Sequence, residues 1–453
     1  MLKNLRRKTF GDLKANWGQF LAVWLVVTLG TAFYGAMYPA GVNMRESLYR
    51  TYDQLHYMDF QVQLGDALME PQIVDEVRAV PGVENAEGRL VIEGGVQLDA
   101  DQDYPVSLRL ISVPDDREPS VNQNDITDGR TIQGPDELLL LKSFADWNEI
   151  EPGDELRVRV NDQMLTMTVA GLVFNPEYLV AGRNSTSPFP ALSSFGVAWV
   201  RYSWLAGQSG VENGQINDVV VHLPGESSTE PKAGADDVRE HLNALFDGTN
   251  AQVFARKQTA SGGVIDANIN GVFPLMRFYS GVFLLGSTII TGVLLARLVE
   301  SERQRIGTLR AMGVTRRELM LHYLTFGAFI GITGGLVGSI LGYLNSFWVM
   351  NTFLHYLAGG TLPGFVNTPQ IPFLLLGFVI VAAGSTVAGA YPAWVQSRTP
   401  PGVALRPATP KTPNAISQLR LRFLPPVLRR AVRGILRCRD VRWVRRWAWS
   451  RER

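Results

Sequence analysis

Four long apolar stretches stand out along the 453-residue chain, at residues 17–38, 278–296, 321–347 and 373–391. A helix that crosses the hydrocarbon core of a bilayer needs about 20 predominantly apolar residues, and each stretch is close to that length or longer. The last two belong to one run, 319–397, that contains no Asp, Glu, Lys or Arg. Glycines and prolines between Asn351 and Gln370 divide this run. The pattern therefore predicts four membrane helices, with a short external loop at 348–372.

The first apolar stretch follows a basic leader at residues 1–16, an arrangement that a cleaved secretory signal also has. The apolar core of a signal peptide spans about 7–15 residues, which is shorter than this stretch. We therefore favour a membrane helix that is retained in the mature protein.

Residues 45–270, between the first two stretches, carry the patterns of a mixed α/β domain. Apolar residues recur at helical spacing in 71–80 and again in 235–246. Residues 156–160 and 165–169 alternate between apolar and polar on either side of a short turn, which is the pattern of a β-hairpin. The predicted fold class is an α-helical polytopic membrane protein with a large α/β domain between helices 1 and 2.

The charged residues are unevenly distributed. Residues 45–270 contain 16 Lys and Arg against 36 Asp and Glu, and the rest of the chain contains 27 against 6. Because Lys and Arg are retained on the cytoplasmic side of membrane proteins, we expect the leader, the connector at 297–318 and the tail at 398–453 to be cytoplasmic. The α/β domain is then extracytoplasmic, and the chain is a multi-pass protein of the plasma (inner) membrane. This distribution excludes an ordinary cytosolic enzyme.

The sequence offers no recognisable catalytic or metal-binding pattern. The histidines of the domain, His56, His222 and His241, lack metal-ligand spacing, and Cys438 is the only cysteine. None of the seven lysines follows a glycine, as a phosphate-binding P-loop requires. We therefore predict a non-catalytic chain that holds no metal or cofactor and binds no nucleic acid.

The connector carries an amphipathic pattern. Ile306, Leu309 and Met312 recur at three-residue spacing and are flanked by arginines. One interpretation is a charged helix that lies on lipid headgroups. The other is a helix that contacts a soluble partner, and the pattern alone leaves both open.

The third apolar stretch contains two series of glycines at four-residue spacing, namely Gly327, Gly331, Gly335 and Gly334, Gly338, Gly342. Small residues at this spacing let helix backbones approach closely in lipid. Glycine is also common in membrane helices generally. The regular spacing favours close packing, against either the same chain or a second copy.

Two motifs carry a resemblance to a known family. The connector reads E-R-x-x-I-G-x-L-R-A-x-G-x-x-R-R-E from Glu302 to Glu318, and the end of the fourth stretch reads Pro392-Ala393, Ser397-Arg398, Pro400 and Ala404-Leu405-Arg406-Pro407. Both resemble motifs of the FtsX/MacB/LolC-like permeases of ABC transporters. The order of one helix, an exported domain of the MacB-like periplasmic core type and three further helices is also similar to that family.

The resemblance implies a permease subunit that pairs with a second permease copy and docks onto a separate ABC ATPase, which binds the ATP. Such permeases drive export or extracytoplasmic work, for example on lipoproteins, peptides, antibiotics or cell-wall hydrolases. The implied partners are therefore the ATPase, the second copy, membrane lipid and an exported substrate or extracytoplasmic partner. An alternative function is a membrane-anchored extracytoplasmic sensor or binding protein without an ATPase. The implied coupling residues are Glu302, Arg305, Ile306, Leu309, Arg310, Met312 and Gly313.

The C-terminal tail departs from the family pattern. Residues 424–437 resemble the basic leader that opens the second half of duplicated members, but no apolar stretch follows. We favour the interpretation that the chain is the N-terminal half of a duplicated permease, ended by truncation or a shifted reading frame. The alternative is a natural basic tail that lies on anionic lipid.

Overall fold

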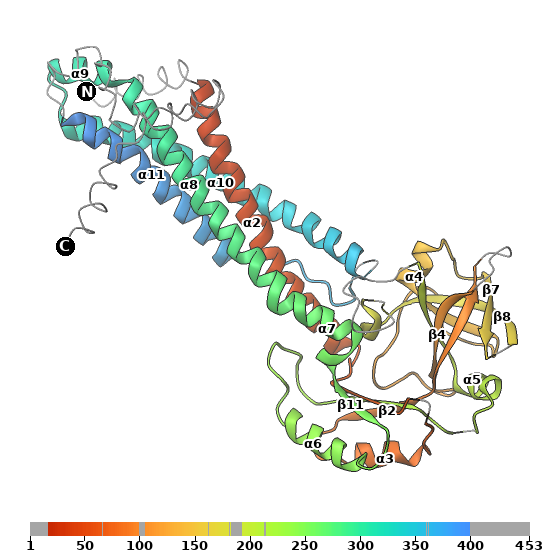
Figure 1. Cartoon of the computed structure of the whole chain (residues 1–453). Coiled ribbons are helices and arrows are strands. Elements are labelled where there is room, and N and C mark those ends of the chain that lie inside the picture. The colour runs from red at the N-terminus through yellow and green to blue at the C-terminus, as the bar shows by residue number, and fades with distance from the viewer. Residues whose placement is uncertain are drawn as a thin grey trace, which may run out of the picture.

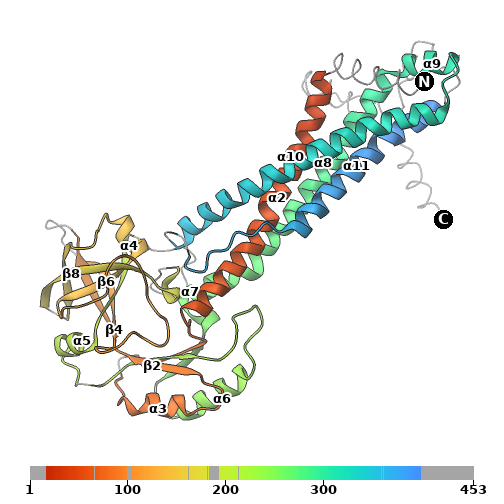
Figure 2. The same ribbon diagram turned by 180° about the vertical axis from the view of Figure 1, so that it is seen from behind.

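The computed structural model describes residues 17–398 except 66, 99–104, 162, 181, 183–192, 213, 359 and 361. The predictions for the leader at 1–16 and for the tail beyond Arg398 lie outside the described residues. The chain is elongated, with a bundle of long helices at one end and a domain that contains all the strands at the other (Figures 1 and 2).

The bundle consists of α2 (Trp17–Gln54), α8 (Phe273–Ser301), α10 (Arg316–Ala358) and α11 (Ile371–Ser397). Each of these segments is long and apolar enough to cross a membrane. The α/β domain is inserted between α2 and α8. The predicted fold class, four membrane helices with a large α/β domain after the first, is therefore confirmed.

Two of the helices extend well beyond their apolar stretches. At about 1.5 Å per residue, α2 and α10 are roughly 55–65 Å long, about twice the thickness of the hydrocarbon core. The sequence predicts that the domain starts at residue 45, but α2 continues to Gln54. The external loop was expected from residue 348, but α10 ends only at Ala358. The apolar stretch marks the part of a helix that lies in lipid. The helix itself continues for as long as its next turns pack against other parts of the protein.

The helical segment that leads from the domain back to the bundle also begins inside the predicted domain. Helix α7 (Ala260–Ala267) passes through a π-helical turn, η3 (Asn268–Val272), directly into α8. The domain is therefore attached through two helical stalks, α2 on the way out and α7–η3–α8 on the way back (Figure 1).

The domain contains a four-stranded antiparallel sheet in the order β11 (Gln252–Ala255), β1 (Phe60–Gln63), β10 (Asp218–His222) and β2 (Asn85–Arg89). Two short helices, α3 (Gln72–Arg78) and α6 (Ala235–Leu245), pack on this sheet. Both lie where the apolar spacing predicts them. Val74 and Val77 of α3 and Val238 and Leu242 of α6 are buried against the sheet.

The second sheet contains seven strands, namely β3 (Val91–Gln97), β4 (Val106–Val113), β5 (Asp125–Gly129), β6 (Glu137–Leu141), β7 (Glu155–Val160), β8 (Gln163–Phe174) and β9 (Phe195–Arg201). Their order is β5-β8-β6-β9-β4-β3-β7, and β7 pairs again with β8. This last pairing closes six strands into a barrel filled by Val and Leu side chains. The β7–β8 pair is the predicted hairpin, and Asn161 at its turn has a φ of 50°.

The remaining short elements follow strands of the two sheets. They are α4 (Lys142–Trp147) and α5 (Tyr202–Ser209), which follow β6 and β9, and the 3-10 turns η1 (Pro176–Tyr178) and η2 (Arg256–Gln258).

The bundle and the domain share one apolar core, which we call the junction cluster. Its members come from α2, α7–η3–α8, the outer end of α10 and the base of the domain. It contains Ala40, Met44, Leu48, Tyr52, Leu55, Tyr57, Met58, Val121, Phe174, Leu179, Val180, Val220, Ile265, Ile269, Phe273, Met350, Leu354 and Leu362. Because Met350 and Leu354 belong to this cluster, the outer end of α10 lies in the same apolar core as the base of the domain.

Candidate functional site

Helix α9 (Arg303–Ala311) lies between α8 and α10, at the end of the bundle that is farthest from the domain (Figures 1 and 2). Gly313 has a φ of 93°, which suits glycine and turns the chain back after the helix. Thr315 and Glu318 then form a reciprocal capping pair, in which the Glu318 amide donates to Thr315 Oγ1 and the Thr315 amide donates to Glu318 Oε2. The connector is thus a short helix held between two defined turns.

One side of α9 packs on the bundle. Ile306 is 1% exposed and lies in an apolar cluster with Leu298, Leu319 and Tyr323. Leu309 is half-buried against the same cluster. The apolar side of this helix is therefore already covered by the chain itself.

The other side of α9 is open. Gln304, Arg305, Thr308, Ala311 and Met312 are all exposed, and Met312 reaches 66%. These positions follow one another at i, i+1, i+4, i+7 and i+8, which places them on a single face of a helix. We call this surface the α9 face.

The predicted stripe of Ile306, Leu309 and Met312 is therefore not a single exposed surface. Three-residue steps on a helix of 3.6 residues per turn move each side chain back by about 60°, so Met312 lies roughly 120° from Ile306. Ile306 consequently points into the bundle and Met312 points away from it. Ile306, one of the implied coupling residues, is therefore covered by the bundle of its own chain.

The other predicted residues of the connector lie around this face. Glu302, whose side chain is 16% exposed, pairs with Arg305 at 3.0 Å between Oε2 and Nη1. Arg310 is half-buried in the last turn of α9, and Gly313 is exposed at the turn after it. Arg305, which pairs with Glu302, therefore lies beside the exposed Met312 on the α9 face.

The two glycine series lie on different faces of α10. Gly327, Gly331 and Gly335 face α11, where an added Cβ at Gly331 would lie 2.9 Å from the Cα of Ala382. Gly334, Gly338 and Gly342 face α2, where an added Cβ at Gly338 would lie 2.6 Å from the Thr28 carbonyl oxygen. Both neighbours belong to the same chain. The sequence did not single out the glycines on the opposite side of these contacts, Gly35 of α2 and Gly389 of α11, because each stands alone.

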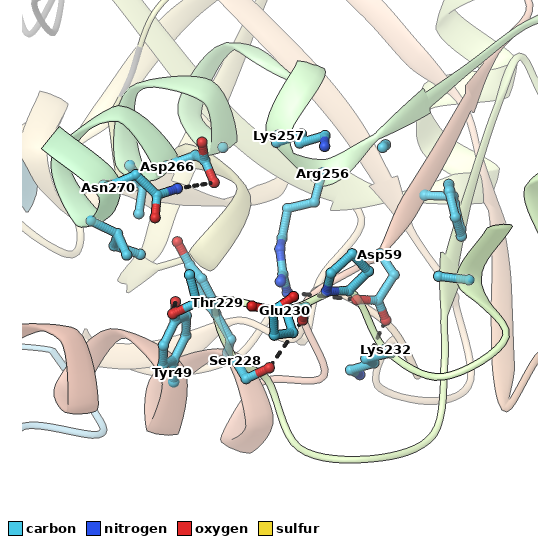
Figure 3. A pocket seen from close by; sticks show the side chains of 18 of the residues that line it. Tyr49, Asp59, Ser228, Thr229, Glu230, Lys232, Arg256, Lys257, Asp266 and Asn270 are labelled. Carbon is cyan, nitrogen blue, oxygen red and sulfur yellow. Dashed lines mark hydrogen bonds and ion pairs between the residues drawn. The ribbon is translucent and has the colours of Figure 1, made fainter.

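A pocket of about 300 Å³ lies where the stalks meet the domain, between α2, α7 and residues 228–232 (Figure 3). Two of its basic side chains pair with the same carboxylate. Lys232 Nζ lies 3.1 Å and Arg256 Nη1 3.6 Å from the Asp59 carboxylate. Arg256 also lies over the Tyr52 and Tyr57 rings. The pocket therefore joins α2 to the domain, and its paired charges do not select one class of ligand.

A buried ionic network joins the two sheets of the domain. Arg89 of β2 donates two hydrogen bonds to Glu177 of η1, at 2.6 and 2.8 Å, and a third to Asp218 of β10, at 2.7 Å. Burial raises the pKa of the Asp218 carboxyl. Burial acts in the same direction on Glu177, but Arg89 outweighs it and holds the pKa of that carboxyl below its usual range. Sequence reasoning missed this network because its members are far apart along the chain and no local pattern marks them.

The histidines of the domain have structural contacts. His222 Nδ1 lies 2.8 Å from the Tyr57 carbonyl oxygen, and its ring lies 5.5 Å from that of His56. Among the residues that the structure describes, no three His, Cys, Asp or Glu side chains come together in a way that could hold a metal ion.

Comparison with known proteins identifies the part of the bundle that runs from α8 to α11. Residues 277–401 match the family model described as "FtsX-like permease C-terminal", which confirms the predicted family. No curated protein matches the chain.

Two solved structures of extracytoplasmic domains are similar to parts of the chain. The extracellular domain of the noncanonical ABC-type transporter YknZ from Gram-positive bacteria is 16% identical, with a TM-score of 0.27 over 43% of this chain and 98% of that one. The periplasmic region of MacB from Actinobacillus actinomycetemcomitans is 11% identical, with a TM-score of 0.30 over 49% of this chain and 96% of that one.

Proposed function

We propose that this chain, whose residues 277–401 form an FtsX-like permease domain, is the membrane subunit of an ABC transporter. In this proposal a separate ABC ATPase binds and hydrolyses ATP, and two permease copies act together. Both termini and α9 are cytoplasmic, and the acidic domain works on a substrate or partner outside. The chain itself performs no catalysis.

The observation that carries the proposal is the α9 face. The sequence left open whether this helix lies on lipid or contacts a soluble partner. A helix that lies on lipid inserts its apolar side into the headgroup boundary. In α9 the apolar side, with Ile306, is buried in the bundle, so the side left free is polar except for Ala311 and Met312. An exposed methionine beside an arginine is typical of a protein-contact surface.

The arrangement of α10 supports a mechanical role. Helix α10 follows α9 after a turn of a few residues, and its outer end contributes Met350 and Leu354 to the junction cluster, both 0% exposed. A displacement of α9 would therefore move a rod that ends at the base of the domain. We infer that ATP-driven movement reaches the domain along this rod, and that the work is done outside the membrane, on an exported or extracytoplasmic molecule.

The proposal is tested by purifying the full chain from its native membrane in mild detergent and identifying bound chains by mass spectrometry. We expect a P-loop ABC ATPase, and we expect the complex in lipid vesicles to hydrolyse ATP. A chain that purifies without any such ATPase, under conditions where it stays folded, would contradict the proposal and would instead fit a membrane-anchored sensor.

A further inference from the structure

The segment between α10 and α11 lies along the outer part of α2 and is held there by side chains of α2. Asn43 is 0% exposed, and both ends of its amide are used by this segment. Its Nδ2 donates to the Thr368 carbonyl at 2.9 Å and to Asn367 Oδ1 at 3.2 Å. Its Oδ1 accepts from Gln370 Nε2 at 2.8 Å and from Thr368 Oγ1 at 3.2 Å. A buried amide with all four of these bonds is fully satisfied.

The contact repeats twice more along α2, at four-residue spacing. Ser47 Oγ accepts from the Val366 amide at 2.9 Å. Thr51 Oγ1 accepts from the Gly364 amide at 3.1 Å. Ser47 and Thr51 are 0% and 1% exposed, so these hydroxyls are shielded from water. We call Asn43, Ser47 and Thr51 with residues 364–370 the polar clasp.

The geometry of the polar clasp has a physical basis. Four residues of a helix rise about 6.0 Å, and two residues of an extended chain span about 6.6 Å. Successive clasp residues of α2 therefore meet alternate residues of the segment: Asn43 bonds to Thr368, Ser47 to Val366 and Thr51 to Gly364. Gly364 lies so close that an added Cβ would be 2.5 Å from the Thr51 nitrogen. The two elements are thus matched in register.

We propose that the polar clasp makes α2 and the α10–α11 hairpin move as one body at the outer surface of the membrane. Asn43, Ser47 and Thr51 are then positioning residues for the transmission of movement from α9 to the domain. This inference rests on the proposed function. It adds a specific joint that neither the sequence motifs nor the family match assigns.

The hydrogen bonds of the polar clasp fix the position of the segment along α2, which the apolar contacts around it do not. Apolar burial is non-directional and depends on the area covered more than on one register between two helices. Hydrogen bonds have short, directional geometry and fix one register. Because α2 continues into the domain, fixing the hairpin to α2 turns a displacement of α10 into a displacement of the domain.

The test compares two double variants in the complex with its ATPase, in lipid nanodiscs. Ser47→Ala with Thr51→Val removes two bonds of the polar clasp. Ser280→Ala with Thr31→Val is the matched control, because Ser280 and Thr31 are equally buried, at 0% and 1%, but bond only to carbonyls of their own helices. Asn43→Leu is a third, stronger variant. Hydrogen exchange is measured with and without ATP over residues 303–312 of α9, residues 57–64 at the base of the domain and residues 364–368.

We expect amide exchange at Gly364 and Val366 to rise about tenfold in the clasp double variant, the effect of losing one hydrogen bond of typical strength. In the wild type and the control, ATP should change exchange both in α9 and at the base of the domain. In the clasp variants, ATP should change exchange in α9 while the response at the base of the domain is reduced or lost. A full response at the base of the domain in folded clasp variants would overturn the inference.

Failure of the proposed function gives a different result. If the wild-type chain binds no ABC ATPase, or if ATP changes nothing in α9, the transporter proposal fails. If α9 responds in every variant and the clasp variants transmit the response as the control does, only the joint is wrong. If the clasp double variant does not fold, Asn43→Leu decides in its place, and a loss of folding in both would overturn a role limited to transmission.

Discussion

Gly342 of α10 lies directly against Gly35 of α2, so that a Cβ added to Gly342 would be 2.8 Å from the Gly35 Cα and 2.7 Å from the Ala32 carbonyl oxygen. These atoms belong to the backbone and cannot move aside as a side chain does. The contact brings the two longest helices of the bundle together at the level where α2 leaves the apolar region.

The close approach of these helices predicts that Gly342→Ala destabilises the bundle. The helices must separate to admit the methyl group, and overpacking of this kind costs about 1–3 kcal/mol. We expect a lower unfolding temperature in detergent. Gly281→Ala in α8 is the control, because a Cβ there meets nothing within 4 Å. Equal unfolding temperatures for both variants would show that α2 and α10 do not pack as described.

The orientation of the chain can be read from cysteine labelling, in a background where Cys438 is replaced by serine. Ser227 of the acidic domain is only 7% exposed and is therefore a poor labelling position. Its neighbour Ser228 is exposed and is the better position. We expect Ser228→Cys to react with an impermeant maleimide in intact cells. Thr308→Cys on the α9 face should react only after permeabilisation, and the opposite pattern would reverse the orientation.

The acid stability of the domain should depend on Glu87. Burial would raise the pKa of its carboxyl, but hydrogen bonds from Arg117, at 2.6 and 2.9 Å, and from Ser120 hold that pKa below its usual range. Because the folded-state pKa is lower than the unfolded one, the stabilisation is present above the unfolded value of about 4.3. It is lost as the pH falls from there through the folded pKa.

Glu87→Gln removes this titration. We expect the variant to be less stable than the wild type at neutral pH, and its stability to fall less steeply between pH values of about 5 and 3. The measurement is the unfolding midpoint of the full chain in detergent as a function of pH. Glu76→Gln, at an exposed position of α3, is the control. Parallel curves for wild type and Glu87→Gln would contradict the assignment.

Local patterns predicted the elements whose apolar spacing is complete within one segment. The helices α3 and α6 and the β7–β8 hairpin are of this kind. In α3, for example, the spacing of Val74 and Val77 places both side chains on the face that packs on the sheet. The rest of the barrel depends on pairings such as β6 with β9, between segments far apart in the chain, which no window of sequence contains. The apolar pattern did not predict the ends of α2 and α10, because it marks only the part of each helix that lies in lipid.

The sequence indicated where the α9 face lies along the chain, but not which side chains of the helix point outward. The connector motif located α9, yet a spacing of three residues does not say which side of the helix a bundle covers, so the burial of Ile306 could not be predicted. The polar clasp has a signal that was available. Asn43, Ser47 and Thr51 stand at i, i+4 and i+8, a polar stripe on the buried side of the outer part of α2. Their partners, 364–370, could not be read from the sequence.

The central claim is that the α9 face binds an ABC ATPase. It is tested most directly by the dissociation constant of the detergent-solubilised chain for the ATPase that purifies with it, with and without Met312→Asp. Burial of one such side chain contributes about 1.5–3 kcal/mol, so we predict binding weakened by roughly ten- to a hundredfold. Met164→Asp, an exposed methionine on the barrel, is the matched control and should bind as the wild type does. An unchanged dissociation constant for a folded Met312→Asp chain would contradict the account.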